Sequence, residues 1–236
     1  MMDHFVYIPE AHSLDVYPVS SEEHHHLRNV LRAENGDELF VLNGKGIHFL
    51  AIIESIDKRS SYIRTTSILK QEEQGKDYLH LAVAPTKNID RFEFLLEKAV
   101  EIGVDRITPV LCARSERRQI RTDRMEKIVI SAMKQSHALF KAELDELTPL
   151  QDLKSDAEIK AIAHCMSDSD RQYLRDLEMR SSLLLIGPEG DFSPEELEWA
   201  LEQGFSPISL GEKRLRTETA AIFGLSVIHH LRQSHD

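Results

Sequence analysis

The chain has 236 residues, of which 41% are hydrophobic and 29% charged, a composition typical of a soluble globular protein with one large domain or two small ones. It contains no apolar stretch as long as a membrane span, and residues 1–10 lack the basic and apolar regions of a secretory signal, so we expect a cytoplasmic protein without a membrane partner. Cys112 and Cys165 are expected to be buried free thiols, and the sequence shows no metal-ligand spacing, so no metal is expected.

The net charge of −11 argues at first sight against a nucleic-acid partner. Its distribution weakens that objection, because residues 143–202 hold 16 acidic and 5 basic residues and so account for the whole excess. The rest of the chain is neutral and contains local basic clusters. A polyanion requires a basic face rather than a basic average, so the charge does not exclude RNA.

Residues 5–70 are predicted to form a small β-rich unit with one helix. Turn dipeptides at Asn35-Gly36 and Asn43-Gly44 separate strand-like runs, and Ser20 begins the helix. Three adjacent histidines, 24–26, point in different directions on a helix and cannot converge on one metal ion. A solvated helix face is therefore the favoured interpretation of these histidines.

The polar stretch 71–77 is interpreted as a linker, so we predict two domains, 1–72 and 73–236. In the second domain, apolar runs alternate with helix-like segments. Strands are expected at 78–84, 107–112, 159–165, 183–186 and in a run ending at 210, and helices at 91–102, 122–139, 167–180, 194–203 and 220–231. This alternation predicts a parallel α/β sheet.

Two strand–loop–helix units follow one another between residues 183 and 224. The first loop is Gly187-Pro188-Glu189-Gly190, and the second runs from Gly211 to Thr219 and contains three basic residues. Ligands of parallel α/β sheets bind outside the carboxyl ends of the strands, and glycine lets the main chain approach a ligand closely. The alternative is a pair of well-made turns with solvated charges. The tandem arrangement, at what we expect to be adjacent strand ends, favours a ligand site.

A basic cluster follows the predicted strand at 107–112. It places five arginines within eleven residues: Arg114, Arg117, Arg118, Arg121 and Arg124. Such a charge run is usually a solvated loop. Its position beyond a strand end favours contact with phosphate groups instead.

Three segments carry a resemblance to a known family. Leu185-Ile186-Gly187-Pro188-Glu189-Gly190, Leu210-Gly211 and Leu215-Arg216-Thr217-Glu218-Thr219-Ala220 resemble the ribosomal RNA small subunit methyltransferase E family. These SPOUT-class enzymes methylate N3 of a uridine in 16S rRNA from S-adenosylmethionine. The resemblance implies an N-terminal PUA-like β-barrel that docks RNA and a C-terminal SPOUT domain with a parallel sheet and a deep trefoil knot. It also implies a homodimer that acts on 16S rRNA or on the assembled small ribosomal subunit.

The resemblance further implies roles for individual residues. Uridine N3–H is a weak acid, so the enzyme must remove that proton and stabilise the charge that spreads over O2 and O4. We assign the stabilising role to Arg216, while Glu218 is either the catalytic base or a carboxylate that caps its helix. Residues expected to hold the cofactor are His164, Leu185, Ile186, Gly187, Glu189, Gly190, Leu210, Gly211, Leu215 and Thr219. Residues expected to contact RNA are Arg28, Arg32, Lys87, Arg114, Arg117 and Arg118.

Three positions depart from the family's pattern. Asp191 stands where the family usually has a second glycine, and Lys213-Arg214 shifts the arginine of the second loop. His137-Ala138 stands where the family commonly has a small residue and an arginine, so no role for that arginine is carried over. The departures leave S-adenosylmethionine as the expected cofactor.

Other functions remain open at this point. The chain could be a non-catalytic RNA-binding factor for ribosome assembly, or a SPOUT RNA methyltransferase with another target. It could also be an α/β enzyme that binds a phosphorylated nucleotide at the two glycine loops.

Overall fold

A computed structural model of the chain describes residues 4–75, 77–165, 171–176 and 180–233. The chain divides into two compact units: Met1–Gln74 with Met133–Lys141, and Gly75–Ala132 with Ala142–Asp236. The segment Met133–Lys141, which was expected in the second domain, therefore groups with the first unit. In the described part of the chain, no helix is long and apolar enough to span a membrane.

The first unit is built on a five-stranded sheet in the order β1-β3-β4-β5-β2. The strands are β1 Phe5–Tyr7, β2 Val16–Pro18, β3 Glu38–Leu42, β4 Ile47–Ile56 and β5 Ser61–Gln71. The β1–β3 pair is parallel and the others are antiparallel. Alternate residues of the long strands, such as Phe49, Ala51 and Ile53, are buried in one core, as expected for strands with one solvated face. The predicted β-rich unit is confirmed.

The helix of this unit, α1 (Ser21–His25), begins at Ser20, whose side chain accepts a hydrogen bond from the Glu23 amide at 3.2 Å. It continues into a π-helical turn, His26–Val30. The three adjacent histidines have separate neighbours, because His24 contacts Ser61, His25 contacts Asn29 and His26 stacks on His4. The expected solvated face is wrong for His24 and His26, which are half-buried.

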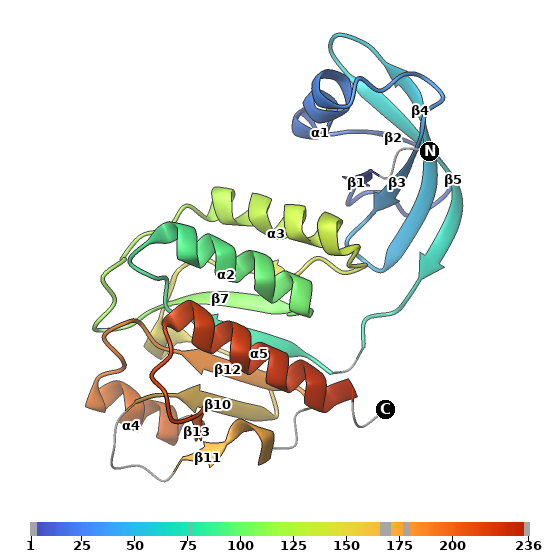
Figure 1. Cartoon of the computed structure of the whole chain (residues 1–236). Helices are drawn as coiled ribbons and strands as arrows, with labels where there is room; N and C mark the ends of the chain where they lie inside the picture. The colour runs from blue at the N-terminus through green and yellow to red at the C-terminus, as the bar shows by residue number, and fades with distance from the viewer. Residues whose placement is uncertain (1–3, 76, 166–170, 177–179, 234–236) are drawn as a thin grey trace. The chain divides into compact units, whose positions relative to one another are not determined.

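The second unit contains an eight-stranded parallel sheet, which confirms the predicted α/β class (Figure 1). Its main path is β11-β13-β10-β12-β6-β7-β8, and β9 also pairs with β7. The strands are β6 Leu79–Val83, β7 Arg106–Leu111, β8 Glu143–Leu144, β9 Thr148–Pro149, β10 Ile159–Ala163, β11 Gln172–Tyr173, β12 Ser182–Ile186 and β13 Ser206–Ser209. The helices are α2 Ile89–Ile102, α3 Thr122–Ser136, α4 Pro194–Glu202 and α5 Thr217–Gln233.

The central strand, β12, is buried along its whole length. Leu184 contacts Gly224 of α5, whereas Leu183 and Leu185 share a core cluster with Ala200 of α4. Because side chains alternate across a strand, α4 and α5 cover opposite faces of the sheet. Helices α2 and α5 pack against each other, side by side in Figure 1.

Helix boundaries follow local chemistry. Asn88 caps α2, and Gly103 ends it in the left-handed region at φ 97°. Ser193 and Glu196 form the predicted capping box of α4. Helix α3 ends at Ser136, three residues before the expected end, because His137 adopts a left-handed φ of 57°.

Two expectations are wrong. The predicted helix at 167–180 lies partly outside the described residues, and its described part forms strand β11 and a 3₁₀ turn, Leu174–Asp176. Edge pairing with β13 and burial of Leu174 outweigh the local helix preference. Strands β12 and β13 were expected to be neighbours, but β10 lies between them, since strand order is not encoded in local pattern.

Candidate functional site

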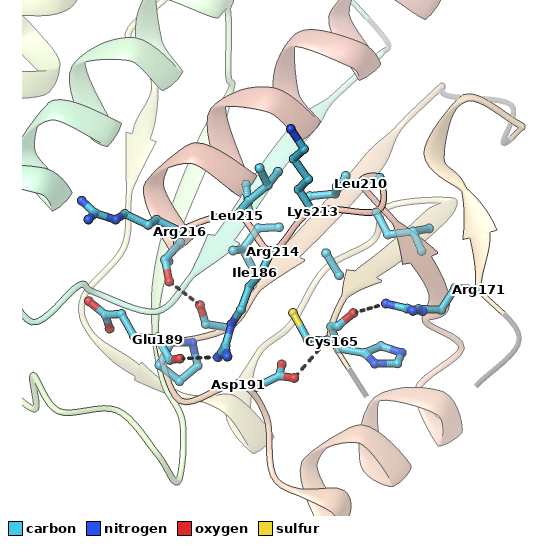
Figure 2. A pocket seen from close by; sticks show the side chains of 18 residues that line it. Cys165, Arg171, Ile186, Glu189, Asp191, Leu210, Lys213, Arg214, Leu215 and Arg216 are labelled. Carbon is cyan, nitrogen blue, oxygen red and sulfur yellow. Dashed lines mark hydrogen bonds between the residues drawn. The ribbon is translucent and has the colours of Figure 1, made fainter. Parts of the chain in front are cut away.

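A cavity of about 360 Å³ lies at the carboxyl ends of β10, β12 and β13 (Figure 2). Its walls come from the segments that follow these three strands, 163–165, 186–191 and 210–217. The inserted strand β10 therefore does not separate the two glycine loops; its end supplies a third wall between them. This volume lies in the usual range of small-molecule sites.

Two hydrogen bonds join the glycine loops. The Thr217 hydroxyl donates to the carbonyl of Gly187 at 3.1 Å, and this bond is buried. The Arg214 guanidinium donates to the carbonyl of Glu189 at 3.2 Å. The two loops are thus one structural unit, although they lie about one helix and one strand apart in sequence.

The first loop packs too tightly for larger residues at two positions. A Cβ at Gly187 would lie 2.8 Å from the ring of Phe192, and a Cβ at Gly190 would lie 3.1 Å from the Cβ of Arg114. Asp191 adopts a left-handed φ of 60°, a backbone conformation that glycine adopts more readily than other residues. Its Oδ2 accepts the Cys165 amide at 3.0 Å, so the departure from the family's pattern ties the first loop to the end of β10.

His164 lies at the end of β10 and lines the cavity, as predicted. It is 5% exposed, and burial lowers the pKa of its imidazole, an effect that the charge of Asp191 opposes. The guanidinium of Arg171 donates to the His164 carbonyl at 2.8 Å. A neutral imidazole is therefore favoured at this wall.

Arg216 is exposed and lines the cavity immediately before α5, where its carbonyl accepts the amide of Ala220 at 2.8 Å. Figure 2 shows its side chain on the same side of the loops as Glu189, with Cys165 and Arg171 on the other side. Within the described residues no hydrogen bond or ion pair is recorded for its guanidinium, which can therefore reach a substrate.

Glu218 lies differently from Arg216. Its carboxylate is 3.8 Å from Nε of Arg91, its side chain is 12% exposed, and it does not line the cavity. This geometry favours the alternative interpretation, a carboxylate at a helix N-terminus that also links α5 to α2.

Seven of the predicted cofactor residues line the cavity: His164, Ile186, Gly187, Glu189, Leu210, Gly211 and Leu215. The other three do not. Leu185 is buried beneath the loop, Gly190 receives Arg114 on its carbonyl at 3.1 Å, and Thr219 is exposed on α5.

Glu189 is held by its own main-chain and side-chain contacts. Its Oε1 accepts the main-chain amide of Lys87 at 2.9 Å, which connects the first loop to the end of β6. Its Oε2 is buried and has no hydrogen-bond partner among the described residues. Glu189, a residue of the cavity lining, therefore has one buried carboxylate oxygen for which the described residues supply no donor.

The comparisons with known proteins agree with this site. Residues 73–229 match a family model described as an RNA methyltransferase domain, and residues 19–66 match one described as an RNA methyltransferase PUA domain. A ribosomal RNA small subunit methyltransferase E from Rickettsia conorii is 32% identical over 90% of this chain and 89% of its own length. The chain belongs to the ribosomal RNA small subunit methyltransferase E family.

Solved structures of this family and its relatives match the whole fold. A structure described as a probable rRNA-methyltransferase from Porphyromonas gingivalis has a TM-score of 0.87 and 39% identity, covering 99% of this chain and 100% of that one. A family member from Neisseria gonorrhoeae, solved bound to S-adenosyl methionine, has a TM-score of 0.83 and 27% identity, covering 97% and 98%. The predicted PUA-like and SPOUT fold classes are confirmed, while the knot stays an implication of the family.

In the present chain, most arginines of the cluster that follows β7 make hydrogen bonds or ion pairs within the protein. Arg114 donates to the carbonyls of Gly190 and Phe192, both at 3.1 Å. Arg117 donates to the carbonyls of Thr86 and Lys87 at 3.0 and 2.6 Å. These two arginines brace the loops around the site, which gives them a structural role that the sequence did not indicate.

The remaining three arginines differ in whether their charge is already paired with a carboxylate of the protein. Arg121 pairs with Asp123 at 2.8 Å, and Arg124 pairs with Glu93 at 2.6 Å. Arg118 is exposed, and within the described residues no hydrogen bond or ion pair is recorded for it. It lines a second, open hollow of about 530 Å³ together with Lys87, Glu116, Arg117 and Gln119.

Arg28 and Arg32, the other predicted RNA contacts, belong to the first unit. Arg28 lies half-buried in the π-helical turn, and Arg32 is exposed with a left-handed φ of 54°.

Sequence reasoning missed several residues that line the cavity. Arg171 and Cys165 follow β10, and Thr217 joins the two loops. The expected burial of Cys165 is wrong, because this residue lies beyond the end of the strand and is exposed, whereas Cys112 is buried as expected. The end of β10 could have been included by the rule that ligands bind at strand ends, but the pattern does not place β10 between the other two strands.

Proposed function

We propose that this protein transfers the methyl group of S-adenosylmethionine to N3 of a uridine in the 16S rRNA of the small ribosomal subunit, and that it acts in the cytoplasm as a homodimer. The observation that carries the proposal is the single cavity enclosed by the two glycine loops and the end of β10. Membership of the methyltransferase E family supplies the substrate and the reaction.

The residues of the cavity fit this cofactor. Ile186, Leu210 and Leu215 give the apolar walls that suit an adenine ring, and the main chain at Gly187 and Gly211 is open to it. Asp191 supplies negative charge near a cationic ligand. The bound cofactor would supply an electrophilic methyl group; the protein must position the uridine and manage its proton and charge.

Arg216 is proposed to stabilise the negative charge that spreads over O2 and O4 of the uracil when N3 loses its proton. A positive charge already positioned where negative charge develops is effective because it requires no reorganisation during the reaction. Arg118 and Lys87 are proposed to bind phosphates of the RNA, and Arg28 and Arg32 to contribute contacts from the PUA-like domain, residues 1–72.

The homodimer is supported by apolar surface on two helices that pack together. Phe94 of α2 is 49% exposed and Phe223 of α5 is 46% exposed. Large exposed aromatic side chains of this kind are enriched at protein interfaces. Light scattering coupled to gel filtration is expected to give the mass of two chains, and the mass of one chain would refute this part of the proposal.

The function is tested by methyl transfer to purified small ribosomal subunits that lack the modification. Digestion of the rRNA and mass spectrometry of the nucleosides is expected to show N3-methyluridine at one position. A methyl group on another atom or base would refute the uracil-N3 assignment. Cofactor binding without any transfer to RNA would instead favour a non-catalytic assembly factor.

A further inference from the structure

We propose that Glu189 is the catalytic base that takes the N3 proton of the target uridine. This inference rests on the proposed function and deepens it, because it assigns the group that accepts the proton. The sequence had left this group unassigned, since Glu218 could be either the catalytic base or a carboxylate that caps its helix. It is carried by the position, fixation and incomplete hydrogen bonding of the Glu189 carboxylate.

The carboxylate is fixed before any ligand arrives. The Lys87 amide, 102 positions away in sequence, donates to Oε1 at 2.9 Å, and Arg214 holds the carbonyl of the same residue at 3.2 Å. The two bonds attach Glu189 to the β6–α2 loop and to the second glycine loop. A base held by such contacts is already oriented, so the reaction does not require a further loss of conformational entropy at this side chain.

The second carboxylate oxygen lacks a donor. Oε2 of Glu189 is buried and has no hydrogen-bond partner among the described residues, and Glu189 is one of the residues that line the cavity. Leaving a buried acceptor unsatisfied destabilises the protein, so a donor from the ligand would be bound favourably. The imide N–H of uracil is such a donor, whereas a sulfonium carries no hydrogen on its sulfur.

The other carboxylates are engaged. Asp191 is the second carboxylate of the cavity wall, and its Oδ1 and Oδ2 accept the amides of Phe192 and Cys165 at 2.9 and 3.0 Å. Glu218 pairs with Arg91 outside the lining. Among the described residues of the wall, Glu189 is thus the carboxylate with an oxygen that no protein donor reaches.

The proposed step balances in atoms and charge. N3 gives its proton to Oε2 of Glu189, and the N3 electron pair forms a bond to the methyl carbon while the carbon–sulfur bond breaks and its electron pair stays on sulfur. Arg216, which extends on the same side of the loops, faces the charge on the uracil oxygens (Figure 2). Glu189 afterwards returns the proton to water.

The test compares Glu189→Gln with Glu212→Gln, an exposed carboxylate of the second loop outside the cavity lining. Glutamine can still accept the Lys87 amide but cannot take a proton. In single-turnover reactions on saturating subunits at pH 7, we expect Glu189→Gln to lower the rate about 10²–10⁴-fold and Glu212→Gln to leave it unchanged. The loss should shrink as the pH is raised, because the imide then ionises without a base.

A structural role would give a different result. We expect Glu189→Gln to retain the thermal stability and the affinity for S-adenosylhomocysteine of the wild type, and Glu189→Asp to restore part of the rate. A loss of rate that is equal at all pH values would overturn the inference, as would a selective loss of affinity for S-adenosylmethionine over its neutral product, which would mark a sulfonium contact. Wild-type protein that transfers no methyl group refutes the proposed function itself.

Discussion

The hydroxyl of Thr217 donates a buried hydrogen bond of 3.1 Å to the carbonyl of Gly187, 30 positions earlier in the chain. This bond joins two loops whose strands are separated by β10. Because both loops line the same cavity, the bond sets the shape of the site as well as the stability of the fold. The cavity therefore depends on a contact between the second loop and the end of β12.

Thr217→Val is expected to weaken binding of S-adenosylhomocysteine about fivefold, because it removes one hydrogen bond worth about 1 kcal/mol while preserving the shape of the side chain. Isothermal titration calorimetry measures the effect. Thr217→Ser keeps the hydroxyl and should bind like the wild type; equal weakening by both variants would show that the bond to Gly187 does not matter.

Arg216→Ala is expected to lower the rate of methyl transfer about 10²–10³-fold, since it removes the positive charge proposed to face the uracil anion. The side chain is exposed, so the melting temperature should change little. Arg121→Ala removes the same charge outside the cavity and should retain activity. Turnover of Arg216→Ala at the wild-type rate would remove this residue from the mechanism.

Asp191 offers a test of the cost of a left-handed backbone in the first glycine loop. Asp191→Gly and Asp191→Ala both lose the bond to the Cys165 amide, but alanine also bears the cost of the left-handed φ of 60°. We expect the glycine variant to be more stable than the alanine variant by about 1 kcal/mol in urea unfolding. Equal stabilities would mean that the backbone relaxes away from this conformation.

Local features of the fold were predictable from sequence, and features that depend on distant partners were not. The capping box at Ser193 and the glycine end of α2 at Gly103 follow from a few neighbouring residues. The engagement of Arg114 depends on a carbonyl 76 positions away, at Gly190. The strand β11 exists because β13 pairs with it. The sequence left Glu218 open between a catalytic base and a helix cap, and it could not anticipate the ion pair with Arg91, which a helix pattern does not place beside Glu218.

His80 makes stability depend on pH. It is fully buried in β6 with Nε2 2.7 Å from the Thr108 hydroxyl, and burial lowers its pKa from 6.5 to about 4. Between these values the unfolded chain holds a proton that the folded chain does not, so stability falls as the pH is lowered.

Between pH 7 and pH 5, the protonation equilibrium of His80 should lower the free energy of unfolding by about 2 kcal/mol, as measured by unfolding in urea. His80→Gln, which cannot be protonated, should show a smaller loss over this range than the wild type. The exposed His25→Gln variant serves as the control and should follow the wild type. An identical pH dependence for His80→Gln and wild type would contradict this account.

Arg118 should contribute to RNA affinity through charge alone. We expect Arg118→Ala to weaken binding to small ribosomal subunits and to reduce the slope of log affinity against log salt concentration by about 1. Arg121→Ala, whose charge is already paired with Asp123, should leave the slope nearly unchanged. Unchanged slopes in both variants would exclude the hollow around Arg118 as a phosphate site.

The central claim is that two loops, joined through Thr217 and Gly187, hold a methyl donor in one cavity. Calorimetric titration of the wild-type protein with S-adenosylhomocysteine and, separately, with ATP tests this claim most directly. We predict saturable binding of S-adenosylhomocysteine at one site per chain and no binding of ATP. Binding of ATP without binding of S-adenosylhomocysteine would contradict the claim and identify the loops as a phosphate site instead.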